Sequence, residues 1–247
     1  MTKENYIYGI RPVIEALKAG KEIDKILIQA GLKGEGIRQL QHFIKEFEIP
    51  FQFVPVDKLN RLSRQNHQGV IAFISEITYQ NLDSIIPFIY EQGKTPLLLV
   101  LDRITDVRNF GAIARTAECA GTDAILIPAK GAAMINSDAI KTSAGALYKL
   151  PVCRCQDMRE SILFLKNSGL RIFAATEKAD TLYTSADFTM PMALILGSEE
   201  NGISEEYLRI ADNRISIPLQ GEIASLNVSV ASGVLLFEIL RQRNKTR

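Results

Sequence analysis

Apolar positions along the first 74 residues follow two alternating patterns. Residues 10–19 and 34–48 place apolar side chains at helical spacing, while shorter segments are continuously apolar. Asp57 is expected to cap a short helix that ends near Arg64. Because helices alternate with strands, the pattern predicts a small α/β domain over residues 1–75. Its strands are expected at 25–29, 51–54 and 69–74.

Residues 96–101, PLLLVL, are a continuous apolar run, which is typical of a central parallel strand covered on both faces. Alternation of apolar runs with amphipathic or capped segments continues to the C-terminus. Six strands with intervening helices predict an α/β fold with a mainly parallel sheet over residues 96–247. The later strands are expected at 124–128, 152–154, 171–176, 192–196 and 214–217. Helices are expected at 111–120, 137–143, 157–167 and 226–243, and after Ser204.

The two units are separated by residues 76–95, which we expect to form a linker. Pro87 interrupts any long helix there, and Gly93 and Pro96 mark its end. A helical turn is expected around residues 82–90.

Polar residues ahead of periodic apolar segments predict where helices begin. Asn109, Ser204 and Ser225 are each expected to be an N-cap. The helix after Ser225 begins with small residues, which allow another backbone or a ligand to approach closely. A helix that begins after a parallel strand is a common ligand site in α/β proteins, so the segment around Asn109 is a candidate site.

Composition narrows the possible classes of protein. Of 247 residues, 47% are hydrophobic and 23% are charged, and the net charge is +1. Nucleic-acid binding would therefore need a local basic surface. No apolar run approaches the roughly 20 residues that span a bilayer, and the N-terminus has no signal-peptide core. An odd, small number of cysteines fits the reducing cytoplasm. With two histidines and a lone C-x-C at Cys153 and Cys155, we expect no metal site.

Basic residues are slightly in excess in the first unit, where residues 1–74 hold eleven Lys or Arg against eight Asp or Glu. Two interpretations are open: an ordinary solvated surface, or a surface that contacts nucleic-acid phosphates. Gly31, Gly34 and Gly36 match neither of the usual phosphate-loop spacings and indicate a turn. The candidate phosphate contacts in or near loops are Lys33, Arg61, Arg64 and His67.

Three stretches of the second unit together resemble the three motifs of the SpoU (TrmH-like) RNA ribose 2′-O-methyltransferases. They are DVRNFGAIARTAEC at 106–119, LILGSEENGIS at 194–204, and IPLQGEIASLNVSVASGVLLFEILRQR at 217–243. In the first unit, IYGIRPVIEAL and the NHQGVIA of residues 66–72 resemble the substrate-binding domain of bacterial 23S rRNA guanosine-2′-O-methyltransferases. The resemblance covers nearly the whole chain.

This resemblance implies a SPOUT-type catalytic domain with a deep trefoil knot near residues 194–235, preceded by an L30e-like domain. Ordinary fold rules would not predict a knot. The resemblance also implies S-adenosyl-L-methionine as cofactor and a homodimer whose active site lies at the subunit interface. The implied catalytic residues are Asn109, Arg115, Glu199, Ser225 and Asn227. The implied cofactor-binding residues are Leu196, Gly197, Ser198, Ile217, Leu219 and Leu226. Arg108 joins Lys33, Arg61, Arg64 and His67 as a candidate RNA contact.

The expected activity is methyl transfer from S-adenosylmethionine to the ribose 2′-hydroxyl of a guanosine in 23S rRNA. A tRNA guanosine methyltransferase and a non-catalytic RNA-binding ribosome-assembly factor on the same scaffold are the alternatives. A nucleotide-dependent dehydrogenase is disfavoured, because no G-x-G-x-x-G follows any expected strand. An arginine side chain stays protonated in water. The resemblance implies that Arg115 is the general base, with the RNA phosphate assisting, whereas our hypothesis is that Arg115 mainly clamps the phosphate beside the target ribose.

Overall fold

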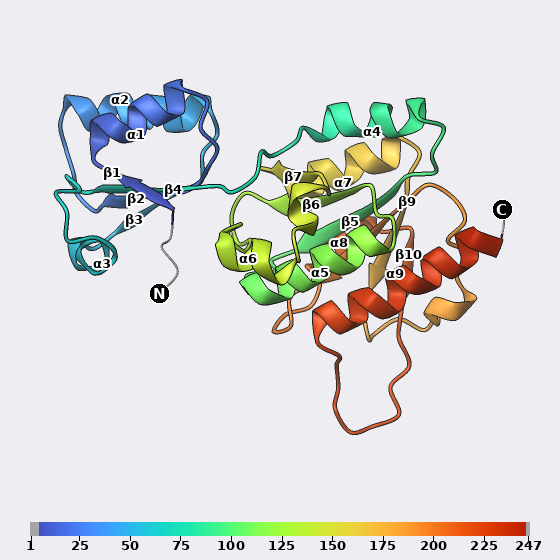
Figure 1. Cartoon of the computed structure of the whole chain (residues 1–247). Coiled ribbons are helices and arrows are strands. Elements are labelled where there is room, and N and C mark those ends of the chain that lie inside the picture. The colour runs from blue at the N-terminus through green and yellow to red at the C-terminus, as the bar shows by residue number, and fades with distance from the viewer. Residues whose placement is uncertain (1–4, 246–247) are drawn as a thin grey trace. The chain divides into compact units, whose positions relative to one another are not determined.

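The computed structural model describes residues 5–245, which divide into two compact units. The first unit holds the described residues up to Thr78 together with Met134–Ser137, and the second holds Tyr79–Ala133 and the described residues from Asp138 onward. Figure 1 shows the chain from its blue N-terminal end to its red C-terminal end.

In the first unit, four strands form one sheet in the order β1-β4-β2-β3. β2 and β3 are parallel, and the other pairs are antiparallel. Helices α1 and α2 pack on one face through a buried cluster that includes Val13, Ile26 and Leu40. The strands are β1 (Tyr6–Tyr8), β2 (Ile23–Gln29), β3 (Phe51–Val54) and β4 (Val70–Ile74), and the helices are α1 (Ile10–Lys18), α2 (Glu35–Glu46) and α3 (Val56–Leu62).

The second unit contains a six-stranded sheet in the order β10-β8-β9-β5-β6-β7, and every adjacent pair is parallel. The prediction of a mainly parallel α/β sheet is confirmed. β5, at the centre, is buried along its whole length, as expected from its unbroken apolar run. The strands are β5 (Leu97–Asp102), β6 (Ala124–Pro128), β7 (Val152–Cys155), β8 (Arg171–Ala175), β9 (Met192–Gly197) and β10 (Asn213–Ile215).

Helices cover both faces of this sheet (Figure 1). α4, α7 and α8 contribute to a buried cluster on one face, and α5 and α9 lie against each other on the opposite face. The helices are α4 (Leu82–Glu91), α5 (Val107–Cys119), α6 (Ser137–Thr142), α7 (Met158–Asn167), α8 (Glu205–Ile210) and α9 (Val228–Lys245). Two 3₁₀ turns, Ala146–Tyr148 and Tyr183–Ser185, complete the elements.

The segment expected as a linker contains the full helix α4, and not only a helical turn. Ile86 and Ile89 are 2% and 4% exposed and belong to the core of the second unit. Pro87 is accommodated inside the helix, in its second turn. Residues 82–91 are therefore part of the second unit's packing.

Three helix starts differ from the sequence predictions. α5 begins at Val107, and Asp106 is its N-cap, accepting a hydrogen bond of 2.7 Å from the Asn109 backbone N–H. α3 begins at Val56, so Asp57 lies inside its first turn. In both cases the predicted cap is a polar residue that lies within the first turn of its helix.

The third difference concerns α9, which begins at Val228 and not at Leu226. Asn227 Oδ1 accepts a hydrogen bond of 2.9 Å from the Ser229 backbone N–H, so Asn227 takes the capping role expected of Ser225. Ser225 lies two residues before the cap. Both polar residues therefore lie near the start of α9, and Asn227 is the one that caps it.

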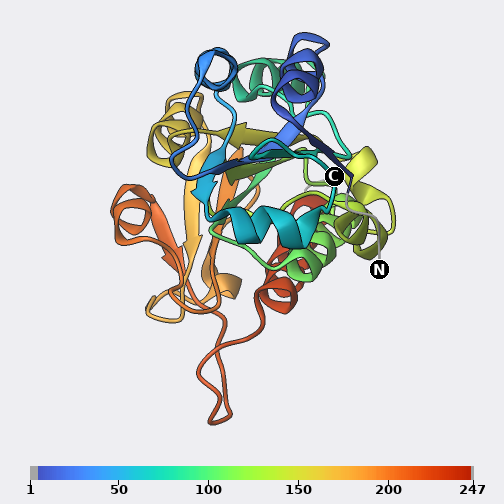
Figure 2. The same ribbon diagram turned by 90° about the vertical axis from the view of Figure 1, so that its left-hand side faces the viewer.

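Parallel strands bring their carboxyl ends to one edge of the sheet, and the segments after β5, β9 and β10 meet there. The longest of these segments, residues 216–227, extends away from the sheet between β10 and α9 as the orange-red loop visible in Figures 1 and 2. Among the helices of residues 5–245, none is long and apolar enough to cross a membrane.

We expect Gly111→Ala to lower the free energy of unfolding by about 1–3 kcal/mol through overpacking of α5 on α6. A Cβ there would lie 2.7 Å from Thr142 Cβ and 2.9 Å from the Ala139 carbonyl oxygen. Gly233→Ala on α9 is the matched control, because its Cβ would meet only Thr116 Cγ2 at 3.8 Å. The Gly233→Ala control should raise the free energy of unfolding by about 0.5–1 kcal/mol, because alanine favours the helix more than glycine does. Urea unfolding at one protein concentration measures the stability of both variants. An equal change in the two variants would contradict the close packing of α5 on α6 at Gly111.

Candidate active site

A cavity of about 340 Å³ lies at the carboxyl edge of the second unit's sheet. Its walls come from the ends of β8, β9 and β10, the turn after β9, and residues between 224 and 235. The six residues with an expected role in cofactor binding all line it: Leu196, Gly197, Ser198, Ile217, Leu219 and Leu226.

The turn at 198–202 closes over the end of β9 and forms one wall of the cavity. Gly202 N donates to the Ser198 carbonyl oxygen at 2.8 Å, and Asn201 N donates to Ser198 Oγ at 3.2 Å. A Cβ on Gly197 would lie 2.1 Å from the Gly202 carbonyl carbon. Only glycine therefore fits at position 197 while the turn stays closed.

The lining of the cavity fits the chemistry of S-adenosylmethionine. Ile215, Ile217 and Leu235 offer apolar surface for a flat adenine ring. Glu177 and Glu200 also line the cavity and can offset a cationic sulfonium or accept from ribose hydroxyls. Backbone groups of the turn at 198–202 add further donors and acceptors.

Three of the five expected catalytic residues meet beside this cavity, although they come from distant parts of the chain. Glu199 Oε1 accepts hydrogen bonds from Asn109 Nδ2 at 3.1 Å and from Asn227 Nδ2. Asn227 Nδ2 also donates to Asn109 Oδ1 at 3.1 Å. The first turn of α5, the turn after β9 and the N-cap of α9 are thereby joined through a single carboxylate.

The other two expected catalytic residues lie differently. Ser225 lines the cavity and is exposed, and within residues 5–245 its hydroxyl has no hydrogen-bond partner. Arg115, two turns along α5 from Asn109, is exposed and does not line the cavity. Its guanidinium forms no hydrogen bond or ion pair with another described residue. Arg115 is thus separate from the cluster in its own chain.

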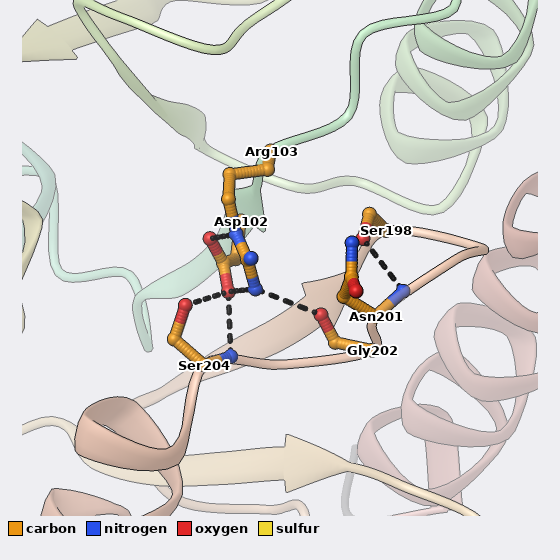
Figure 3. A network of polar contacts seen from close by, with 6 residues as sticks. All are labelled: Asp102, Arg103, Ser198, Asn201, Gly202 and Ser204. Carbon is orange, nitrogen blue, oxygen red and sulfur yellow. Dashed lines mark hydrogen bonds and ion pairs between the residues drawn. The ribbon is translucent and has the colours of Figure 1, made fainter.

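A second polar network joins the end of β5 to the turn after β9 (Figure 3). Asp102 is 2% exposed, and its Oδ2 accepts from Ser204 N at 2.7 Å and from Ser204 Oγ at 2.8 Å. Arg103 donates to both carboxylate oxygens of Asp102, and to the Gly202 carbonyl at 3.2 Å. The hydrogen bonds that Arg103 donates to Asp102 raise the pKa of the Arg103 guanidinium.

This network was missed by the sequence analysis, although the sequence holds a signal for it. PLLLVL is followed directly by Asp102, and an acidic residue that continues a buried strand requires partners. Ser204 occupies the N-cap position of α8 as expected, but its hydroxyl donates to Asp102 and makes no capping bond.

Among the candidate RNA contacts, Arg108 lies exposed in the first turn of α5, and Lys33, Arg61 and Arg64 are exposed in the first unit. His67 differs from expectation, because it is only 8% exposed and both ring nitrogens are used. Nδ1 accepts from Gly69 N at 3.0 Å, and Nε2 lies 2.9 Å from Asn60 Oδ1. His67 therefore holds the turn before β4 in place and is not free to contact RNA.

Cys153 and Cys155 lie in β7, as expected of strand residues. Burial raises the pKa of the Cys153 thiol to about 12, so this thiol stays protonated at neutral pH. Within the part of the chain that the structure describes, no group of three or more His, Cys, Asp or Glu side chains is arranged to hold a metal ion.

Comparison with known proteins identifies the family of this chain. Residues 96–237 match the model of the SpoU rRNA Methylase family, and residues 6–80 match the model described as RNA 2′-O ribose methyltransferase substrate binding. The chain belongs to the SpoU rRNA methylase family. Its parallel sheet and the N-terminal substrate-binding domain agree with the fold class that the sequence predicted.

Relatives of this SpoU-family chain match along most of its length. A Staphylococcus saprophyticus protein named as a TrmH-family tRNA/rRNA methyltransferase is 34% identical over 98% of this chain and 97% of its own. The AdoMet-bound rRNA methyltransferase of Sinorhizobium meliloti has a TM-score of 0.62 at 25% identity, covering 97% of this chain and 88% of its own. The A. aeolicus TrmH/SpoU tRNA modifying enzyme has a TM-score of 0.57 at 30% identity, and the match covers 67% of this chain and 85% of that enzyme's chain.

We expect Gly197→Ala to weaken the binding of S-adenosylmethionine by about a hundredfold, because the added Cβ forces the turn at 198–202 off the end of β9. Gly221→Ala is the matched control, since Gly221 lies in the neighbouring loop with no atom within 4 Å of the added Cβ. Titration calorimetry with the purified protein measures both affinities. Unchanged affinity in Gly197→Ala would contradict the closed turn.

Proposed function

We propose that this SpoU-family protein transfers a methyl group from S-adenosyl-L-methionine to the ribose 2′-hydroxyl of a guanosine in 23S rRNA. The observation that carries the proposal is the cluster of Asn109, Glu199 and Asn227 beside a cavity that suits the cofactor. When bound, the cofactor supplies an electrophilic methyl group on a sulfonium.

The protein's own residues would hold the hydroxyl in line with that methyl group. Orientation of this kind lowers a barrier by on the order of 7–11 kcal/mol. Ser225 and the two asparagine amides can hydrogen-bond a ribose hydroxyl, and Glu199 fixes both amides through one oxygen. This geometry favours a positioning role for Glu199.

Arg115 would hold the RNA phosphate next to the target ribose, because a guanidinium binds phosphate through two parallel N–H groups. Arg115 lies outside the cavity of its own chain and has no described partner there. We infer that it serves the cavity of a second subunit, which would make the active site a shared one.

The surface of α9 supports a homodimer. Val230 and Phe237, seven residues apart on one side of α9, are 52% and 51% exposed, and Ile223 in the preceding loop is 78% exposed. Apolar side chains grouped in this way commonly mark a protein interface. A two-fold interface along α9 and the neighbouring α5 would bury these side chains.

The substrate-binding unit favours rRNA over tRNA. Residues 6–80 match a substrate-binding model, whereas the A. aeolicus tRNA modifying enzyme covers only 67% of this chain.

A non-catalytic RNA-binding role is disfavoured because Asn109, Glu199 and Asn227 are all present and joined by hydrogen bonds beside the cavity. We also infer that residues 194–235 carry the trefoil knot, as the family resemblance implies, because the segments after β9 and β10 and the start of α9 all line one cavity.

The test is transfer of labelled methyl groups to total RNA from a strain that lacks this gene, followed by separation of 23S, 16S and tRNA. We expect label at the ribose of a guanosine in 23S RNA, and loss of at least about a hundredfold in Asn109→Ala. Label in tRNA would overturn the rRNA assignment but retain the reaction. If the protein binds the cofactor but no RNA becomes labelled, the result would count against catalysis on these substrates. If the protein neither binds the cofactor nor labels any RNA, the result would favour the non-catalytic RNA-binding alternative.

The shared site predicts that two inactive variants restore each other. Asn109→Ala and Arg115→Ala subunits, co-expressed with different tags, form mixed dimers that combine one intact cluster with the Arg115 of the other chain. A random mixture should recover about a quarter of wild-type turnover, because half of the dimers are mixed and each has one complete site. Each variant alone is the control. Turnover no higher than in the controls, with mixed dimers verified by the two tags, would contradict a shared site.

A further inference from the structure

The polar network at the end of β5 has no role in the reaction proposed above (Figure 3). Asp102 carries a buried carboxylate that receives two hydrogen bonds from Ser204 and two from Arg103. A buried carboxylate is costly unless such donors satisfy it. The buried carboxylate is therefore stabilised by donors from two segments of the chain. Ser204 follows the turn after β9, and Arg103 directly follows β5 and reaches that turn through the Gly202 carbonyl.

Arg103 has a backbone conformation that orients its side chain toward this turn. Its φ of 58° lies in the left-handed region, which is unfavourable for a residue with a Cβ. In this conformation the guanidinium reaches back to Asp102 and, through Nη2, to the Gly202 carbonyl at 3.2 Å. One planar group thus connects the end of β5 with a turn that lies 99 residues further along the chain.

The turn held by this network has two functions in the proposed site. Ser198, Asn201 and Gly202 line the cofactor cavity, and Glu199 in the same turn holds Asn109 and Asn227. Apart from the network, the turn is closed by two hydrogen bonds to Ser198. A loop already fixed in its binding conformation loses less entropy when a ligand binds.

We propose that Asp102 and Arg103 are positioning residues that hold the turn at 198–202 and the following N-cap residue Ser204 against β5, and so set the affinity for the cofactor. This inference rests on the proposed use of S-adenosylmethionine. Arg103 acts through the Gly202 carbonyl, and Asp102 acts through the backbone and hydroxyl of Ser204. Neither residue lines the cavity, so their effect on the cofactor is transmitted by the turn.

Arg103→Lys is the first variant to measure, because it keeps the positive charge beside Asp102 and loses the planar fork. The Arg103 side chain is 39% exposed, so the protein should still fold. We expect the Kd for S-adenosylmethionine to rise about tenfold, as for loss of one hydrogen bond to a charged group. The KM for RNA should stay unchanged, a split that a general loss of structure would not produce.

Arg159→Lys is the matched control. Arg159, on α7, also pairs with the carboxylate of an adjacent residue, Glu160 at 2.9 Å, but it lies outside the network and does not line the cavity. Ser204→Ala tests the other side, since it removes only the hydroxyl donor to Asp102, and Ser204→Thr should restore that donor. The double variant Arg103→Lys/Ser204→Ala should weaken binding less than the two single effects combined, because both act on one turn.

Titration calorimetry with the full-length protein and S-adenosylmethionine gives every affinity without requiring turnover. Weaker binding in Arg103→Lys and Ser204→Ala, with Arg159→Lys and Ser204→Thr near wild type, would support the proposal. Wild-type affinity in both Arg103→Lys and Ser204→Ala would overturn it. Failure of the wild-type protein itself to bind the cofactor would instead overturn the proposed function, so the two failures are distinguishable.

Discussion

The close approach of the Gly202 backbone to Gly197 is the constraint on which the proposed site depends. With 2.1 Å between the Gly202 carbonyl carbon and any Cβ at position 197, the turn after β9 can close only over a glycine. Once closed, the turn forms a wall of the cavity and brings Glu199 to the asparagines of α5 and α9. A single missing methyl group thus determines both the shape of the cavity and the place of the polar cluster.

The arrangement of the second unit could be predicted from its apolar runs because each buried parallel strand is a short, continuously apolar segment. β5, β6 and β9 were located to within one residue at either end. Elements whose stability depends on neighbours were predicted less well. β1 has three residues, which is too short for a recognisable pattern, and pairs with β4 more than 60 positions away. α4 was read as a linker because burial of Ile86 and Ile89 depends on a core formed by later strands.

The site shows the same division between local and distant information. The motifs implied five catalytic residues, and the structure brings three of them, Asn109, Glu199 and Asn227, together from positions 90 and 28 residues apart. Hydrogen-bond partners were not predictable from the motifs. Several polar residues compete for each helix start, and only the folded backbone decides that Asp106 caps α5. His67 has the same explanation, because burial beside Asn60 and Gly69 determines its role.

The identity of Asn227 follows from the two tasks that its side chain performs at once. Its Oδ1 accepts from Ser229 N and caps α9, while its Nδ2 donates to Glu199. Aspartate could cap the helix but would place a second carboxylate against Glu199, and serine has no amide to span the gap. Glu199 Oε1 also lies 3.4 Å from Val228 N, so the positive end of the α9 dipole stabilises the carboxylate. An amide at a helix N-cap is therefore the side chain that satisfies both the helix and the acid, which explains why the polar cluster of Asn109, Glu199 and Asn227 lies where α9 begins.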